Sequence, residues 1–229
     1  MTEPLRLVVF DVDGTLVDSQ ADIVASMTRS FQAVGHPIPA RDAVLGIVGL
    51  SLDVAMERLA PGLDDRDYQE MVDAYRLAYT ELRRAKGSME SSPLYPGARE
   101  ALEAVAARPS TLLGVATGKS RRGLDLLIEG HGLVGTFTTM QVSDLHPSKP
   151  DPSMLLAALS ETGVEPGDAV MVGDTTYDME MARAAGVAGL GVAWGYHQAE
   201  RLAEAGARRV LSGFEDLPAA LDDLWEATR

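Results

Sequence analysis

The sequence predicts an α/β protein with a Rossmann-like, doubly wound parallel sheet and an inserted all-helical cap domain. Beyond residue 87, short valine-rich apolar segments alternate with helical patterns, and this alternation is typical of parallel sheets. Between the first apolar segment and residue 87 the patterns are helical throughout, so the first strand is followed by a helical insertion. A chain of 229 residues is long enough for one such core with its insertion.

The predicted core begins with the segment LRLVVF at residues 5–10. Nearly all of its side chains are apolar, which indicates a strand buried on both faces of the sheet. Further strands are predicted for TLLGVAT, FTTMQV, AVMVG and AGLGVAW, and helices for residues 97–107, 121–129, 152–162, 177–185 and 215–226. We therefore assign residues 1–17 and 87–229 to the core.

Residues 18–86 are expected to form the helical cap. Apolar and aromatic side chains recur there at helical spacing, and they include Ile23, Met27, Phe31, Leu52, Met56, Tyr68, Met71 and Tyr75. Ser51 is placed to be the N-cap of one of these helices. Two neighbouring connections, near residues 15–19 and 87–96, would join the cap to the core, and a hinged lid needs such an arrangement.

Composition restricts the range of functions. The chain has 34 acidic and 20 basic residues and a formal net charge of −14, which disfavours binding to nucleic acid or anionic membranes. It contains no cysteine, so neither disulfides nor a thiol nucleophile are available. The N-terminus lacks the pattern of a signal peptide, and no apolar run approaches the ~20 residues that span a bilayer. We expect a cytoplasmic monomer or homodimer that acts on a small molecule.

Polar residues follow several predicted strands at their carboxyl ends. Ligands of doubly wound sheets bind beyond these ends, so the side chains there should converge. The residues concerned are Asp11, Asp13, Thr117, Gly118, Lys149, Asp174 and Asp178. Burying carboxylates close to one another is costly unless another group compensates their charge.

A hard cation such as Mg²⁺ would compensate this charge, because it binds oxygen ligands and is often completed by substrate phosphate. Asp11 and Asp174 suit direct ligation, and Asp178 suits a ligand or outer position. Asp11 and Asp13 lie two residues apart in an extended segment, so one could attack while the other transfers a proton. Lys149 could neutralise phosphate.

Thr117, together with backbone amides from Gly118 onward, could bind phosphate oxygens at the start of a helix.

The segments DVDGTLVD, VATGK, SKPDP and GDTTYD resemble the four motifs of the haloacid dehalogenase-like (HAD) phosphohydrolase superfamily, in the family's order. The helical insertion resembles the family's cap. The late segments GVAWGY and RLAEAGARRV are similar to those of phosphoglycolate phosphatases.

This resemblance implies a Mg²⁺-dependent phosphatase that works through an aspartyl-phosphate intermediate. Asp11 would be the nucleophile, and Asp13 would protonate the leaving group and then activate water. Thr117 and Lys149 would hold the phosphoryl group. The metal would bind Asp11, Asp13 through its backbone carbonyl, and Asp174, with Asp178 beside them. A small phosphomonoester similar to phosphoglycolate is the expected substrate.

Four alternatives share part of this pattern. A phosphomutase of the β-phosphoglucomutase type has the same motifs and cap, but GIVGLSLD at residues 46–53 departs from the basic pattern associated with mutases. A pyrophosphatase would use the same chemistry. The halide-releasing branch of the superfamily uses no Mg²⁺ and lacks the second aspartate, Asp13. A receiver-like phosphoacceptor, which is not an enzyme, would lack the long helical insertion.

The cap is expected to supply the residues that select the substrate. Gly49, Leu50 and Ser51 lie at the turn before a predicted cap helix, and they are small or neutral, which suits a compact substrate. Arg58 is the candidate cation for a substrate carboxylate, although a surface position is favoured for it. Three further residues are expected outside the chemistry: Lys119 at the surface, and Tyr75 and Tyr79 in the core of the cap.

Overall fold

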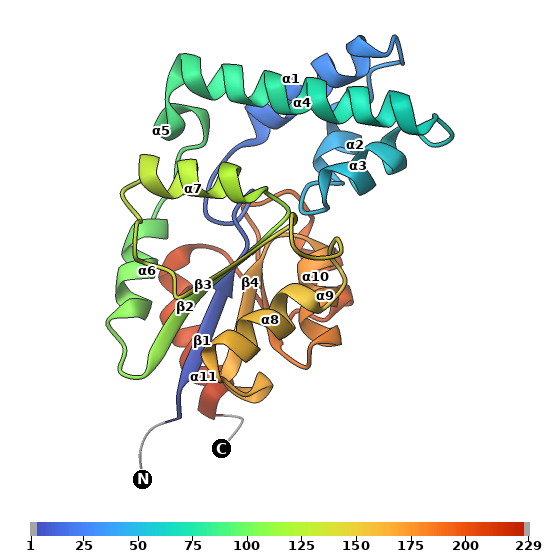
Figure 1. Cartoon of the computed structure of the whole chain (residues 1–229). Helices are drawn as coiled ribbons and strands as arrows, with labels where there is room; N and C mark the ends of the chain where they lie inside the picture. Colours follow the sequence, from blue (N-terminus) through green and yellow to red (C-terminus); the bar gives the residue numbers. More distant parts are fainter. Residues whose placement is uncertain (1–3, 227–229) are drawn as a thin grey trace.

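A computed structural model describes residues 4–226 of the chain as an α/β fold (Figure 1). Six strands form one sheet in the order β3-β2-β1-β4-β5-β6, and all neighbouring strands pair in parallel. The strands are β1 (Arg6–Phe10), β2 (Thr111–Thr117), β3 (Thr139–Val142), β4 (Ala169–Gly173), β5 (Ala188–Val192) and β6 (Arg209–Leu211). The predicted fold class is confirmed.

Eleven α-helices occur within residues 4–226. They are α1 (Gln20–Ala33), α2 (Arg41–Leu45), α3 (Leu52–Leu59), α4 (Asp65–Lys86), α5 (Ser88–Ser91), α6 (Ala98–Ala106), α7 (Arg121–Gly130), α8 (Ser153–Thr162), α9 (Thr176–Ala184), α10 (Ala199–Ala205) and α11 (Leu217–Glu226). No helix of this part of the chain is long and apolar enough to cross a membrane.

Strand β1 shows why the sheet is covered on both faces. Val8 and Phe10 pack into one apolar cluster with helices α6, α7 and α11, whereas Leu7 and Val9 pack into a second cluster with α8 and α9. Successive side chains of a strand point to opposite faces, so a continuous apolar run is required here. Because β1 lies between β2 and β4, the residue that follows Phe10 is placed at the centre of the sheet edge.

Helices α1 to α4 pack around an apolar cluster of their own. Its buried members include Ile23, Met27, Phe31, Met56 and Met71, and α1 lies alongside α4 (Figure 1). These helices lie beyond the carboxyl ends of the strands, above the sheet in Figure 1. The assignment of residues 18–86 to a separate cap domain stays a prediction.

The structure contains elements that the sequence patterns did not predict. Helices α2 and α5 are short, and strand β6 has three residues, of which Arg209 is exposed. Such short elements carry too few apolar residues to show a period. Ser51 stands at the N-cap position of α3 as predicted, but its side chain caps no backbone amide there.

Candidate active site

The loop after β1 carries Asp11 and Asp13 to the edge of the sheet. The amide of Asp11 donates to the carbonyl of Val172 at 2.9 Å, which continues the pairing with β4. Gly14 follows with φ +88°, a conformation that favours glycine. A Cβ atom on Gly14 would also collide with the Asp174 carboxylate. The loop therefore packs directly against the residue that follows β4.

Three buried carboxylates meet at this edge. Asp11, Asp174 and Asp178 each offer an oxygen, and these oxygens lie within 4.8 Å of one another. Lys149 Nζ lies between two of them, 2.7 Å from Asp11 Oδ1 and 2.7 Å from Asp178 Oδ1, with its side chain fully buried. One ammonium group thus contacts two of the three carboxylates, and the cluster keeps an excess of negative charge if all are ionised.

This excess changes the protonation of the cluster. Burial raises the pKa of Asp11 to about 7, and the nearby Asp178 adds to this, although Lys149 opposes it. Burial and the charge of Asp11 also raise the pKa of Asp174 well above its usual value. Carboxyl groups with raised pKa values gain most from a cation that replaces their protons.

The cluster fits a divalent metal ion. Asp11 Oδ2 is buried and has no hydrogen-bond partner among the described residues, so one lone pair of the cluster is unused. The available ligand atoms are carboxylate oxygens, which suit hard cations. A buried acidic triad of this kind could hold a divalent metal.

Asp178 has its oxygens engaged by other groups. Oδ2 accepts from the amide of Thr175 at 3.0 Å and from its hydroxyl at 2.7 Å. The amide of Asp178 in turn donates to Thr175 Oγ1 at 3.3 Å, and the two hydrogen bonds donated by amides form the capping box of α9. Oδ1 is paired with Lys149. Asp178 therefore links the start of α9 to Lys149. Because both of its oxygens are already engaged, a position beside the metal ligands is favoured for Asp178 over direct ligation.

Two side chains that are distant from each other in the sequence contact the carboxylate of Asp13. Ser19 and Lys119 both contact its Oδ1 atom, and Lys119 Nζ lies 2.8 Å away. The same Nζ donates to the hydroxyl of Tyr79 on α4 at 3.1 Å. Burial lowers the pKa of Lys119, but the charge of Asp13 more than offsets this and leaves it above its usual value.

The prediction that Lys119 is a surface residue is wrong. Its side chain is 10% exposed because α4 covers it through Tyr79. The placement of Tyr79 in the cap core is correct in part, since Tyr75 and Tyr79 pack against the cap cluster and also line the pocket. Both neighbours of Lys119 are distant in sequence, so no local pattern could have revealed them.

The other predicted phosphate-binding residues lie beside Asp11. Thr117 is buried, and its hydroxyl oxygen accepts from the amide of Lys119 at 3.2 Å. A Cβ atom on Gly118 would lie 2.6 Å from the carbonyl oxygen of Leu50, so the loop before α3 rests directly on this glycine. Thr117 and Gly118 thus line the bottom of the site, and Gly118 also contacts the loop before α3.

Further hydrogen bonds hold the α3 loop on the core. The amide of Ser51 donates to Ser148 Oγ at 2.8 Å, and the Tyr177 hydroxyl donates to the carbonyl of Gly46 at 2.9 Å. Arg58 donates to the Tyr177 hydroxyl at 3.1 Å and lies over its ring. Arg58 is therefore engaged outside the pocket, away from a substrate carboxylate.

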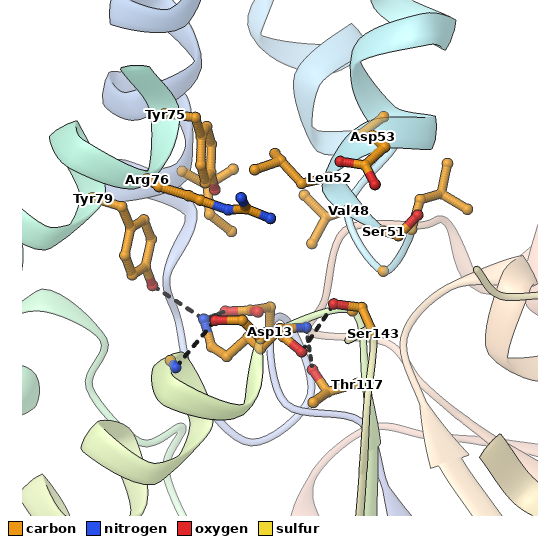
Figure 2. Close-up of a pocket in the computed structure, with 18 of the residues that line it drawn as sticks. Asp13, Val48, Ser51, Leu52, Asp53, Tyr75, Arg76, Tyr79, Thr117 and Ser143 are labelled. Atoms are coloured by element: carbon orange, nitrogen blue, oxygen red, sulfur yellow. Dashed lines mark hydrogen bonds and ion pairs between the residues drawn. The ribbon is translucent and has the colours of Figure 1, made fainter. Parts of the chain in front are cut away.

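A cavity of about 420 Å³ lies between helices α1, α3 and α4 and the sheet edge (Figure 2). Asp11, Asp13, Thr117 and Gly118 line its lower part, and the predicted cap residues Gly49, Leu50 and Ser51 line it from above. The sequence patterns did not identify the lining residues of α4, which include Tyr75, Arg76, Tyr79 and Arg83. Tyr75, Tyr79 and Arg83 recur at four-residue intervals and Arg76 adjoins them, so they share one side of the helix, but this spacing alone does not show that this side faces the cavity.

Similarity to known proteins agrees with this geometry. A profile described as "Haloacid dehalogenase-like hydrolase" matches residues 8–192. The chain belongs to the haloacid dehalogenase-like hydrolases. Within this family it is 34% identical, over 219 residues, to the probable phosphatase IndB of Dickeya dadantii, which covers 93% of this chain and 92% of the relative.

Other haloacid dehalogenase-like relatives support the same placement. A phosphoglycolate phosphatase of Pseudomonas putida is 34% identical over 194 residues, with 84% of this chain and 71% of the relative covered. The crystal structure of a hydrolase from Pseudomonas syringae superposes with a TM-score of 0.83 at 26% identity, covering 95% and 98% of the two chains. The predicted family, its phosphoglycolate phosphatase-like subgroup and the class of phosphoric monoester hydrolases are confirmed.

Lys149→Met is expected to destabilise the protein by about 3–5 kcal/mol at pH 8, because it leaves buried carboxylates without their cation. Without Lys149 the pKa of Asp11 should rise further above 7. The native state then binds more protons than the unfolded state, so the stability of the variant falls as pH rises. Urea unfolding of the metal-free protein at pH 5.5 and pH 8 measures this. An equal loss at both pH values would contradict it.

Proposed function

We propose that this protein is a Mg²⁺-dependent phosphatase that hydrolyses a small phosphorylated metabolite through a phosphorylated Asp11. The observation that carries the proposal is the buried group of Asp11, Asp174, Asp178 and Lys149, of which Asp11 lines the cavity. The unpartnered Oδ2 atom of Asp11 supports its assignment as the attacking group. Nucleophilic catalysis by a carboxylate divides the hydrolysis into two steps.

In the first step, an Asp11 oxygen forms a bond to phosphorus while the ester bond of the substrate breaks. Asp13 donates a proton to the departing alkoxide, which leaves as an alcohol. In the second step, Asp13 takes a proton from water, the water oxygen attacks phosphorus, and Asp11 is released with inorganic phosphate. Ser19 and Lys119 hold Asp13 at Oδ1, so its orientation is set before the substrate binds.

The remaining residues would bind and orient the phosphoryl group. Thr117 and the amide of Gly118 are proposed to donate to its oxygens, and the Lys149 ammonium to neutralise their charge. Asp11, the backbone carbonyl of Asp13, and Asp174 are the proposed metal ligands. When bound, Mg²⁺ would supply charge neutralisation to the carboxylates and the phosphoryl oxygens.

The cap loop is proposed to contact the rest of the substrate. Gly49, Leu50 and Ser51 line the cavity opposite Asp13, which supports their role in selecting substrates. Phosphoglycolate is the first compound to test, because several curated relatives are phosphoglycolate phosphatases.

Phosphate release from phosphoglycolate, glucose 1-phosphate and pyrophosphate, measured with and without Mg²⁺, tests the proposal. We expect release that requires Mg²⁺. Isomerisation of glucose 1-phosphate without phosphate release would indicate a phosphomutase instead. A stable phosphorylated Asp11 without turnover would indicate a receiver-like phosphoacceptor, and release dominated by pyrophosphate would indicate a pyrophosphatase.

A further inference from the structure

The cavity is large for a two-carbon acid phosphate. Its volume of about 420 Å³ falls in the range, roughly 300–1,000 Å³, of pockets that bury drug-sized ligands. The α3 loop is already seated on the core in this state, through Leu50 on Gly118 and Ser51 on Ser148. Phosphoglycolate bound at Asp11 would therefore leave much of the cavity to water. The space fits an organic body larger than two carbons.

The wall formed by α1, α3, α4 and the loop before α3 carries apolar and aromatic side chains alongside the polar residues Asp53, Arg76, Thr80 and Arg83. Ile23, Met27, Val48 and Leu52 line it together with Tyr75 and Tyr79. The two tyrosine rings are stacked, with centroids 6.0 Å apart and planes inclined by 17°. Figure 2 shows them on the opposite side of the cavity from Val48 and Leu52. Surfaces of this kind bind a ring or a chain of carbon atoms by excluding water.

Arg76, which is an exposed residue, brings a positive charge to this part of the cavity. In Figure 2 its side chain extends from α4 into the cavity, between the tyrosines and Leu52 and above Asp13. Within residues 4–226, its guanidinium takes part in none of the hydrogen bonds or ion pairs. Arg83 on the same helix instead donates to the carbonyl of Gly123 at 3.3 Å, and Lys119 is paired with Asp13. Arg76 therefore keeps its donors for a ligand.

We propose that the site takes a phosphomonoester with a ring-sized body that carries a carboxylate, and that Arg76 binds this carboxylate. This proposal rests on the proposed function, because the phosphate of such a compound must lie at Asp11. A guanidinium group binds a carboxylate through two parallel hydrogen bonds, which gives direction as well as attraction. Arg76 is thus assigned as a specificity-determining residue, and it takes the carboxylate-binding role for which Arg58 was the candidate from the sequence.

Four phosphate esters separate size from charge. Ethyl phosphate and phosphoglycolate have two-carbon bodies, without and with a carboxylate, and phenyl phosphate and 4-carboxyphenyl phosphate are the corresponding ring compounds. We expect kcat/KM of the wild type to be highest for 4-carboxyphenyl phosphate. Arg76→Met should lower this value about 10- to 100-fold, mainly through KM, as expected for loss of a charge-assisted interaction. Its effect on phenyl phosphate should stay within about twofold.

Arg84→Met is the matched control, because Arg84 is exposed on the same helix and does not line the cavity. It should leave all four values unchanged. An equal loss for all four compounds in Arg76→Met, or a highest kcat/KM for phosphoglycolate, would overturn the proposal. The proposal would also be overturned if Arg122→Met, which removes another cation of the cavity, abolished the preference for the carboxylate while Arg76→Met did not.

A binding measurement distinguishes failure of this inference from failure of the proposed function. If the wild type releases phosphate from none of the four compounds in Mg²⁺, the phosphatase proposal fails. Calorimetric titration of 4-carboxyphenyl phosphate into the Asp11→Asn protein still measures the contribution of Arg76 to binding affinity, because it needs no turnover. Binding that weakens about 10- to 100-fold on adding Arg76→Met supports the inference, and unchanged binding overturns it.

Discussion

Asp11→Asn is expected to abolish turnover, with kcat lowered by about four to six orders of magnitude, because an amide oxygen is a poor nucleophile. The substitution is close in shape, and it removes one charge from a cluster in which burial raises the pKa of Asp11 to about 7. The metal-free variant should therefore be at least as stable as the wild type at pH 8. Phosphate release and thermal unfolding measure the two effects.

The control for this substitution is Asp65→Asn, which removes an exposed carboxylate in the first turn of α4. It should retain full activity. Acid quenching of the wild type during turnover should leave phosphate on the peptide that contains Asp11, and this signal should vanish in Asp11→Asn. An active Asp11→Asn protein would contradict the covalent mechanism.

Removal of divalent metal by a chelator is expected to stop turnover completely, and added Mg²⁺ should restore it. The reason is the charge of the site, where Lys149 alone faces Asp11, Asp174 and Asp178 within the described cluster. Because burial raises the pKa values of Asp11 and Asp174, protons compete with the cation for these carboxylates. The apparent affinity for Mg²⁺ should therefore fall below pH 7, by about tenfold per pH unit for each proton released.

The same protons make the stability of the metal-free protein depend on pH. Between pH 4 and pH 7, roughly, the native state binds more protons at Asp11 than the unfolded state does. The free energy of unfolding consequently decreases as pH rises through this range. Mg²⁺ should then raise the melting temperature more at pH 8 than at pH 6. A larger shift at pH 6, or activity that persists in excess chelator, would contradict the metal site.

Local sequence patterns were sufficient for the sheet and for the floor of the site. The run that ends at Phe10 can only be buried on both faces, and the residue after a central parallel strand must lie at the ligand-binding edge. The same reasoning placed Thr117 at the carboxyl end of β2 and Asp174 directly after β4, and both lie at this edge in the structure. These positions could be predicted because strand period and chain order are local properties.

The upper half of the cavity could not be predicted in this way. Lys119 looks like a surface residue until α4 covers it, and Arg76 is one of many charged residues on a long amphipathic helix. Their positions depend on how α4 packs against α1 and how the α3 loop rests on Gly118. The sequence by itself determined the fold class and which residues lie at the carboxyl ends of the central strands. The tertiary structure decided which cap side chains face that edge, because packing between distant segments sets the orientation of a helix.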